Sequence, residues 1–424
     1  MIPTAPPEGA PHHPPRLPRP HPVPRLAEPA VPLPGPAGVE EFWAGVRRRG
    51  TPLIAPDPQG SPAHRAVTFL WRGTPATRAV QVLPNKLADP RSPEDNLMTR
   101  APGTDIWHWT VRLRCDWRGT YDFGVDGGDG PAPGDPDYWP WLRTRRRHDP
   151  HNPATLPRRW GGEPLSRAEL TTPPAEFRWR RRAGVPHGTV TEHTVPSRHL
   201  GTARRVWLYA PPATALRAVP PGGLPLLVLL DGDHWQPRLD VAGLLDNLVA
   251  DGRIPPLAAV LPDAVDAGTR WRELTCRPWF AAFLTDELLP WAARMLPVTD
   301  DPSRTVIAGQ SLGGLTAAYT ALEAPHRFGN VLAQSGSFWW PEGPSPEWLT
   351  SRIADGPRLP VRFRLSFGLQ EWVALPAARR LRDTLAAAGY TDAVYREFNG
   401  GHDYLCWRTE LADGLAALLA GTHG

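Results

Sequence analysis

Two different hydrophobic patterns divide the chain, and the first is a short-range alternation. Between residues 65 and 125, apolar and polar residues alternate with period two in short segments separated by turn residues. Such alternation predicts half-buried strands of antiparallel sheets. The predicted strands are 65–73, 79–83, 105–113 and 119–125, after a short helix over 39–48. Residues 39–155 are therefore predicted to form an N-terminal all-β sandwich domain.

From Gly188 onward, near-continuous apolar strands alternate with amphipathic helices. A hairpin comes first, formed by residues 188–195 and 204–210. The later strands are predicted over 224–230, 257–261, 306–310, 331–335, 361–367 and 393–398, and the helices over 239–251, 278–296, 315–322, 377–387 and 411–419. Fully apolar strands between helices predict a doubly wound, mostly parallel sheet, so residues 187–424 are predicted to be an α/β domain.

Two segments rich in proline and arginine flank the predicted β domain. Residues 1–38 are predicted to be a disordered Pro-rich tail, and residues 156–186 a disordered linker. A partner that binds polyproline is the alternative for the tail. The basic run 143–147 lies beside the linker, and we interpret it as a solvated connector because no nucleic-acid-binding motif accompanies it.

Composition narrows the class of protein. The chain of 424 residues has no apolar run of transmembrane length and no apolar secretory signal. Its 3 cysteines are interpreted as reduced thiols, which predicts a cytoplasmic protein. No cysteine or histidine cluster has metal-ligand spacing, so no metal or other cofactor is expected. Lys86 is the single lysine, so any anion-binding site is expected to use arginine.

The stretch Val306–Gly314 carries the strongest catalytic signal. It reads as a buried strand, a Gly-Gln-Ser-Leu-Gly turn and a helix start, which is the nucleophile elbow of α/β-hydrolases. Ser311 is therefore the predicted nucleophile. The backbone N–H of Leu312, at the helix N-terminus, is predicted to face an oxyanion.

An activated serine needs a base and an acid that orients the base, and α/β-hydrolases supply them in the chain order serine, acid, histidine. Glu371 follows the predicted strand 361–367 and is the predicted acid, with Asp383 and Asp392 as alternatives. His402 follows the last predicted strand in a Gly-Gly-His-Asp loop and is the predicted base.

The loop 231–235 follows an early central strand, where the second oxyanion donor is expected. The backbone N–H of Asp233 is predicted to serve with that of Leu312. The predicted reaction is acyl transfer to water. The histidine takes the serine proton, the serine attacks an ester carbonyl, the glutamate holds the imidazole, and water then hydrolyses the acyl-enzyme.

These motifs together resemble the enterochelin (ferric enterobactin) esterases, over roughly residues 40 to 420. In the C-terminal part they are Leu230-Asp231-Gly232 with Trp235, Arg272-Glu273-Leu274, Gly309–Gly314, Gln334–Trp340 and Gly400–Asp403 with Trp407. In the N-terminal part they are Val67–Arg72, Gly103–Trp107, Trp117–Tyr121 and Asp149-Pro150. The resemblance implies an Ig-like sandwich ahead of an α/β-hydrolase, and cytoplasmic hydrolysis of the esters of a ferric catecholate siderophore, with iron(III) entering only as part of the substrate.

A ferric catecholate is an anion with flat aromatic faces, so arginine and tryptophan suit it. The candidate contacts are Arg270, Arg272, Trp235, Trp339 and Trp340, with Arg277 as an added anion contact. Trp107, Trp109 and Trp117 are predicted instead to fill the sandwich core. No nucleic acid, membrane or obligate protein partner is expected.

Two other functions stay open at the level of sequence. One is a related carboxylesterase or acyltransferase whose N-terminal domain binds another ligand. The other is a non-catalytic protein that sequesters an iron chelate, against which the presence of Ser311, Glu371 and His402 argues.

Overall fold

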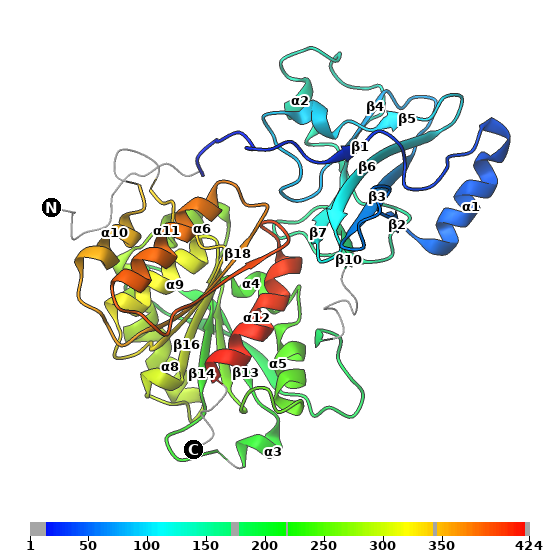
Figure 1. The fold of residues 1–424 in the computed structure, drawn as a ribbon. Coiled ribbons are helices and arrows are strands. Elements are labelled where there is room, and N and C mark those ends of the chain that lie inside the picture. Colours follow the sequence, from blue (N-terminus) through cyan, green and yellow to red (C-terminus); the bar gives the residue numbers. More distant parts are fainter. Residues whose placement is uncertain (1–13, 171–177, 218, 342–345, 420–424) are drawn as a thin grey trace. The chain divides into compact units, whose positions relative to one another are not determined.

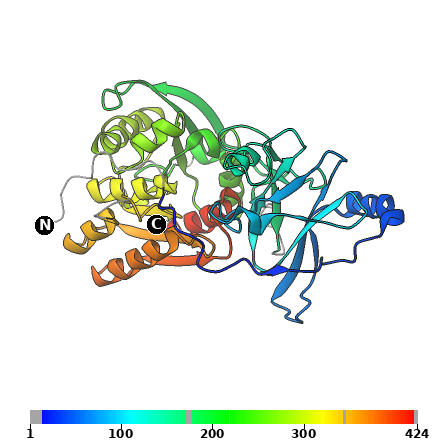
Figure 2. The ribbon, with the colours of Figure 1, turned by 90° about the horizontal axis from the view of Figure 1, so that it is seen from above.

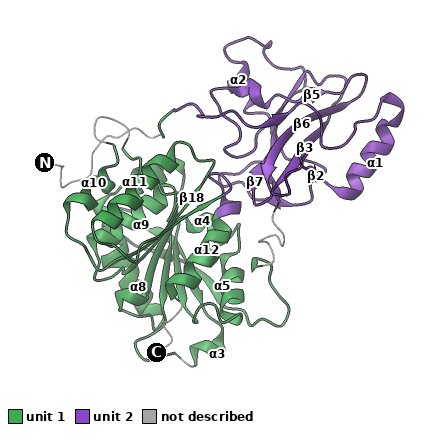
Figure 3. Cartoon of the chain, in the orientation of Figure 1, with its two compact units in different colours: residues 1–16, 175–398, 407–424 green, residues 17–174, 399–406 purple. Residues whose placement is uncertain are grey.

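A computed structural model describes residues 14–170, 178–217, 219–341 and 346–419. The chain forms two units, shown in different colours in Figure 3. We call residues 1–16, 175–398 and 407–424 the α/β unit, and residues 17–174 and 399–406 the β-rich unit. The short second segment of the β-rich unit includes His402.

An eight-stranded sheet forms the centre of the described α/β unit, with the order β12-β13-β15-β14-β16-β17-β18-β19 (Figure 1). The strands are β12 (Thr189–Val195), β13 (Arg204–Ala210), β14 (Leu226–Leu229), β15 (Ala258–Pro262), β16 (Thr305–Gln310), β17 (Asn330–Gln334), β18 (Arg362–Gly368) and β19 (Val394–Phe398). The hairpin β12–β13 joins β15 antiparallel, and every later neighbour is parallel. The predicted mostly parallel sheet is confirmed.

Helices cover both faces of this sheet. They are α3 (Ala213–Leu216), α4 (Gly232–Trp235), α5 (Val241–Ala250), α6 (Ala267–Glu273), α7 (Pro278–Ala282), α8 (Leu289–Met295), α9 (Leu312–Glu323), α10 (Trp348–Asp355), α11 (Ala374–Ala387) and α12 (Tyr404–Leu419), with a π-helical turn η4 (Phe283–Leu288) between α7 and α8 and a 3₁₀ turn η5 (Pro302–Arg304) before β16. Figures 1 and 2 show α9, α10 and α11, in yellow to orange, gathered on one side of the sheet.

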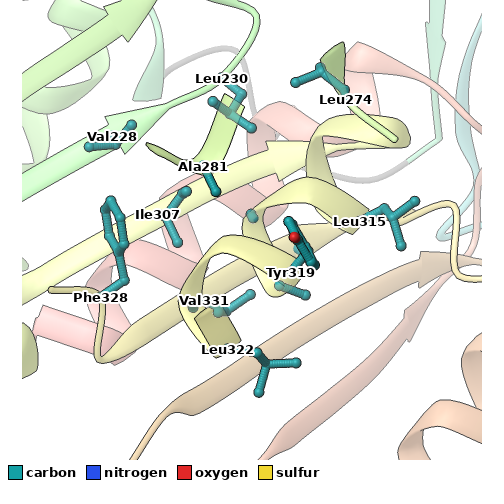
Figure 4. Packing of buried hydrophobic residues seen from close by; sticks show 14 of the residues in the cluster. Val228, Leu230, Leu274, Ala281, Ile307, Leu315, Tyr319, Leu322, Phe328 and Val331 are labelled. Carbon is teal, nitrogen blue, oxygen red and sulfur yellow. The ribbon is translucent and has the colours of Figure 1, made fainter. Parts of the chain in front are cut away.

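Strand alternation explains the two faces. Val331 on β17 packs in one cluster with Leu315 and Tyr319 of α9 (Figure 4). Leu332, the next residue, points the other way, and a Cβ added to Gly414 of α12 would lie 2.5 Å from it. The predicted continuous apolar strands are therefore those that a sheet covered on both faces requires.

The described β-rich unit contains three antiparallel sheets, of order β1-β6-β3-β2 with β5 on β6, β10-β11-β7 and β4-β8-β9. Its strands are β1 (Arg25–Leu26), β2 (Leu53–Pro56), β3 (His64–Arg72), β4 (Ala79–Val82), β5 (Thr99–Arg100), β6 (Ile106–Arg114), β7 (Arg118–Tyr121), β8 (Phe123–Asp126), β9 (Arg146–Arg147), β10 (Thr155–Leu156) and β11 (Leu165–Glu169). Its helices are α1 (Val39–Arg49) and α2 (Tyr138–Leu142), with 3₁₀ turns η1 (Pro36–Gly38) and η2 (Pro93–Asn96). One core joins residues from all three sheets and contains Trp107, Trp109 and Trp117, so the prediction of a core role for these tryptophans is confirmed.

Three sequence predictions about this unit need correction, and the first concerns the strand predicted over 119–125. It is two strands in different sheets, β7 and β8, separated at Asp122. The side chain of Asp122 is fully buried and forms ion pairs with Arg146 and Arg158. A buried charged residue with two arginine partners interrupts the alternation without appearing as a turn in the sequence.

The other two corrections concern the segments predicted to be disordered. Residues 1–13 and 171–177 lie outside the described residues. Elsewhere the predicted tail contributes β1 to the edge of a sheet, where the carbonyl of Pro24 accepts from the backbone of Arg112 at 2.9 Å. Proline lacks a donor but keeps its acceptor, so it is tolerated at an edge. The predicted linker contributes β10 and β11, in which the small residues Ser166 and Ala168 point inward.

Candidate active site

Ser311 lies at the turn from β16 to α9 with φ 58° and ψ −122°. This backbone conformation is strained for a residue with a side chain, and such strain persists where the surrounding structure enforces it. A Cβ added to Gly309 would lie 2.4 Å from the backbone of Gly313, so only glycine lets the strand approach the helix this closely. The turn has the geometry of a nucleophile elbow.

Leu312, the predicted oxyanion donor, is the first residue of α9. Its N–H belongs to the first turn, where backbone donors precede the helix's own hydrogen-bond ladder. Asp233, the second predicted donor, lies in α4 directly after β14, and its side chain accepts from the N–H of Ala264 at 3.2 Å. Since β14 and β16 are parallel neighbours, both turns leave the sheet at the same edge.

Arg270 fixes the loop after β14 against the elbow. Its guanidinium donates two hydrogen bonds of 2.7 Å to Asp231, whose side chain is fully buried, and a third of 3.0 Å to the carbonyl of Gln310. The sequence predicted a substrate contact for Arg270. The structure gives it a bidentate partner within the protein, so Arg270 holds the loop after β14 against the turn that carries Ser311.

Arg272 is the exposed arginine on α6, two residues further along. Its guanidinium donates to Thr269 Oγ1 at 3.3 Å, while Arg277 donates to the carbonyl of Arg272 and to Thr275 Oγ1. Neither contact is with a carboxylate, so both cations keep their capacity to attract an anion. Of the predicted substrate arginines, Arg272 fits the prediction best.

A buried ion pair anchors the helix that carries these arginines. Arg204 on β13 donates to both carboxylate oxygens of Glu273 on α6, at 2.6 and 2.7 Å, and both side chains are almost completely buried. The Arg-Glu-Leu motif therefore has a structural glutamate between its exposed arginine and its apolar leucine.

Arg204→Leu is expected to lower the free energy of unfolding by about 3–5 kcal/mol, because it leaves the Glu273 carboxylate buried without its partner. Urea denaturation followed by tryptophan fluorescence measures the loss. The double variant R204L/E273L is expected to recover most of it, since no unpaired charge then remains. A loss below about 1 kcal/mol in Arg204→Leu would contradict this role for the pair.

Glu371, the predicted acid, follows β18 and is 1% exposed. Its Oε1 accepts hydrogen bonds from the hydroxyl of Ser335 at 2.6 Å and from the N–H of Gly368 at 2.8 Å. Two donors on one carboxylate oxygen fix the direction of the side chain. The alternatives Asp383 and Asp392 are exposed and pair with Arg382 and Arg358.

A chain of buried hydrogen bonds that the sequence did not predict runs from Trp235 to Glu371. The indole of Trp235 donates to Gln310, and Gln310 donates to Gln334. Gln334 donates to the carbonyl of Trp407, whose indole donates to Ser335. The sequence feature that could have revealed this hydrogen-bond chain is the presence of polar residues at the ends of apolar strands, namely Gln310, Gln334 and Ser335.

The segment that follows β17 contacts both Ser311 and Glu371. The hydroxyl of Ser337 lies 3.3 Å from that of Ser311, and its N–H donates to the carbonyl of Ser311 at 2.9 Å. Ser335, two residues earlier, carries the contact to Glu371. Residues 335–337 therefore connect Ser311 to Glu371 within the α/β unit.

His402, the predicted base, lies in the loop between β19 and α12. β16, β18 and β19 run in one direction, since each joins its neighbour in parallel through β17 and β18. The residues that follow them therefore emerge from the same edge of the sheet, in the order Ser311, Glu371, His402. This topology is the one that the catalytic prediction requires.

The predicted aromatic contacts need correction. Trp235 and Trp340 are fully buried and Trp339 is 8% exposed. Trp235 stacks on Trp179, and Trp340 packs edge-on against Trp348. Side chains this deeply buried present little or no ring surface to a substrate, so we assign these three residues to the core under the site.

Within the described ranges, no group of three or more histidine, cysteine, aspartate or glutamate residues could hold a metal ion. None of the described helices combines the length and the apolar character that crossing a bilayer requires.

The sheet order and the strained serine elbow define an α/β-hydrolase preceded by a β-rich domain. Comparison with known families agrees in both halves: residues 66–179 match the family described as "Enterochelin esterase, N-terminal", and residues 197–418 match "Putative esterase". The chain belongs to the enterochelin esterase family and is a carboxylic ester hydrolase.

Individual relatives match along nearly the whole chain. The iron(III) enterobactin esterase of Dickeya dadantii is 35% identical, with 91% of this chain and 94% of the relative covered. The ferric enterobactin esterase structure from Salmonella typhimurium has a TM-score of 0.77 at 32% identity, covering 89% of this chain and 98% of that one. The Shigella flexneri enterobactin esterase, crystallised in the presence of enterobactin, has a TM-score of 0.76 at 33% identity, covering 90% and 98%.

Proposed function

We propose that this protein hydrolyses the ester bonds of a ferric catecholate siderophore with a trilactone backbone, and so allows its iron to be released. The observation that carries the proposal is the strained Ser311 elbow beside the buried, doubly hydrogen-bonded Glu371. Support for the substrate comes from relatives named as iron(III) enterobactin esterases and from the neighbour crystallised with enterobactin. The reaction is proposed to occur in the cytoplasm, as the cysteine usage predicts.

In the proposed mechanism, Ser311, His402 and Glu371 form the catalytic triad. His402 takes the proton from the Ser311 hydroxyl while the Ser311 oxygen attacks an ester carbonyl carbon. The backbone N–H groups of Leu312 and Asp233 stabilise the resulting oxyanion. The ester C–O bond then breaks, and the leaving alkoxide takes the proton from His402.

The second half of the reaction uses water as the nucleophile. His402 deprotonates a water molecule, which attacks the acyl carbon. The bond between that carbon and the Ser311 oxygen breaks, Ser311 takes the proton back from His402, and the acid product leaves. Glu371 holds the imidazole in the required tautomer in both halves. Hydrogen bonds from Ser335 and Gly368 to its Oε1 fix the direction of the carboxylate that accepts the imidazole N–H in this mechanism. Iron remains with the substrate and takes no part in the proton transfers.

Arg272 and Arg277 are the proposed anion contacts. Arg270 beside them donates to the carbonyl of Gln310, which immediately precedes the nucleophile, so α6 adjoins the elbow. A ferric tris-catecholate carries a net negative charge that guanidinium groups attract. The chain thus offers positive charge next to the bond to be cut.

Arg272→Gln is expected to raise the KM for the ferric catecholate about 5-fold to 10-fold, with kcat nearly unchanged, because an exposed charge contact contributes on the order of 1 kcal/mol. Arg294→Gln is the matched control, because Arg294 is exposed in the last turn of α8, at the edge of the sheet away from the elbow. Steady-state kinetics at two salt concentrations measure KM and kcat for both variants. Equal KM values for the two variants would contradict the assignment of Arg272.

The proposal is tested by mass spectrometry of the products formed from ferric and iron-free catecholate trilactones. The expected products are the linear trimer and shorter catechol-serine fragments, formed far faster than by the Ser311→Ala variant. A p-nitrophenyl ester serves as comparator. A kcat/KM for this simple ester equal to that for the trilactone would favour a general carboxylesterase instead.

A further inference from the structure

The loop that carries His402 is structurally part of the β-rich unit. Residues 399–406 group with residues 17–174, although β19 before the loop belongs to the α/β unit (Figure 3). A loop at the end of a hydrolase strand needs only its own turn to project a histidine. Here residues from the N-terminal part of the chain contact it at three successive positions.

Asn85 contacts the loop at His402 itself. Its side-chain amide donates to the carbonyl oxygen of His402 at 2.9 Å, across 317 residues of sequence. A Cβ added to the preceding Gly401 would lie 2.9 Å from the backbone oxygen of Asn85 and 2.8 Å from the Cβ of Lys86. The loop therefore lies directly on the Asn85–Lys86 backbone, and Gly401 is the residue that permits this approach.

Thr120 contacts the residue on the other side of the histidine. Its N–H and its hydroxyl both donate to Oδ2 of Asp403, at 2.5 and 2.8 Å. The other oxygen of Asp403 accepts from the N–H of Leu405 at 2.9 Å and so shapes the start of α12. Burial raises the pKa of Asp403, and the hydrogen bonds from Thr120 act in the opposite direction by favouring the carboxylate.

The two contacts are coupled through one backbone hydrogen bond. The N–H of Asn85 donates to the carbonyl of Thr120 at 2.9 Å, which ties the segment after β4 to β7. Further along the loop, the N–H of Arg118 donates to the carbonyl of Asn399, and the side chain of Asn399 donates to Asp116. The loop is thus held on both sides of His402 by the segment after β4 and by β7, which the hydrogen bond between Asn85 and Thr120 joins.

We propose that Asn85 and Thr120 are positioning residues for the reaction, and that they hold the loop that carries the catalytic histidine. This inference rests on the proposed role of His402 as the base. Neither residue touches the substrate in this account. They act through the backbone on either side of His402, where a displacement of about 1 Å at a catalytic group costs on the order of 100-fold in rate.

Asn85→Ala is expected to lower kcat about 10-fold to 100-fold with little change in KM, because the loss of the amide donor frees the His402 carbonyl. Thr120→Val, which removes the hydroxyl and keeps the N–H, is expected to lower kcat less, and Thr120→Ser is expected to restore it. The rates are measured on the full chain with the catecholate trilactone. They are expressed per active site, counted by titration with a serine-directed phosphonate.

Asn152→Ala is the matched control. Asn152 is a buried asparagine of the same unit whose amide donates to Tyr121 and to the carbonyl of Arg167, neither of which is a loop residue. Both asparagine variants are expected to lose thermal stability, but only Asn85→Ala is expected to lose turnover per titrated site.

Two results would overturn the inference while the wild-type protein remains an active esterase. One is a turnover per site in Asn85→Ala equal to that of the wild type. The other is an equal loss of turnover per site in Asn152→Ala. If the wild-type protein itself fails to cut the trilactone faster than Ser311→Ala, it is the proposed function that is wrong.

Discussion

Ser311→Ala is expected to lower kcat for the catecholate trilactone by a factor on the order of 10⁴ to 10⁶, with the protein still folded. The substitution removes the attacking oxygen and no buried contact of the core, since the Ser311 hydroxyl has the neighbouring Ser337 hydroxyl as its partner. Steady-state assay by liquid chromatography measures the rate, and circular dichroism checks the fold. The small remaining rate comes from oxyanion stabilisation and substrate binding, which the variant keeps.

Ser337→Ala is the control for that experiment. Its hydroxyl lies 3.3 Å from the Ser311 hydroxyl, while its backbone N–H still donates to the Ser311 carbonyl after the substitution. The loss of one side-chain hydrogen bond of about 1 kcal/mol predicts less than a 10-fold effect. A larger loss in Ser337→Ala than in Ser311→Ala would mean that the elbow serine is not the nucleophile.

Glu371→Gln is expected to lower kcat by about 10⁴, with a smaller effect on KM. The amide keeps the shape of the side chain and an oxygen for Ser335 and Gly368, but its NH₂ group cannot accept the imidazole N–H. The histidine then loses the partner that selects its tautomer and stabilises its charged form. The pH dependence of kcat/KM is measured together with the rate.

Asp383→Asn and Asp392→Asn are matched controls for this charge removal. Both carboxylates are exposed and pair with nearby arginines, so each variant is expected to change stability by about 1 kcal/mol or less and to keep nearly the wild-type kcat. Full activity in Glu371→Gln with a loss in either control would assign the orienting acid to another residue.

The parts of this molecule that the sequence predicted well are those that follow local rules. The apolar strands from β14 to β19 are recognisable because burial on both faces excludes polar residues. The elbow is recognisable because the strained serine follows a glycine that the close approach of strand and helix requires. Chain order then limited the acid and the base to the turns after β18 and β19.

The parts that the sequence did not predict depend on contacts between distant residues. Arg270 has the chemistry of an anion ligand, and only its 2.7 Å hydrogen bonds to Asp231 reveal an internal partner. Trp235 and Trp340 have the chemistry of stacking platforms, and only their burial assigns them to the core. Asn85 carries no local signal at all, because its partner lies 317 residues away.

The most direct test that Ser311 is the nucleophile is detection of the acyl-enzyme on this residue. Wild-type protein is mixed with catecholate trilactone, quenched in acid within milliseconds, and analysed by intact-mass and peptide mass spectrometry. Opening of a trilactone by a serine leaves the whole linear trimer attached as an ester. We therefore expect a mass increase equal to one intact trilactone on the peptide that contains Ser311, and no such increase in Ser311→Ala. Product formation without any adduct on that peptide, or with an adduct that persists in Ser311→Ala, would contradict this assignment of the nucleophile.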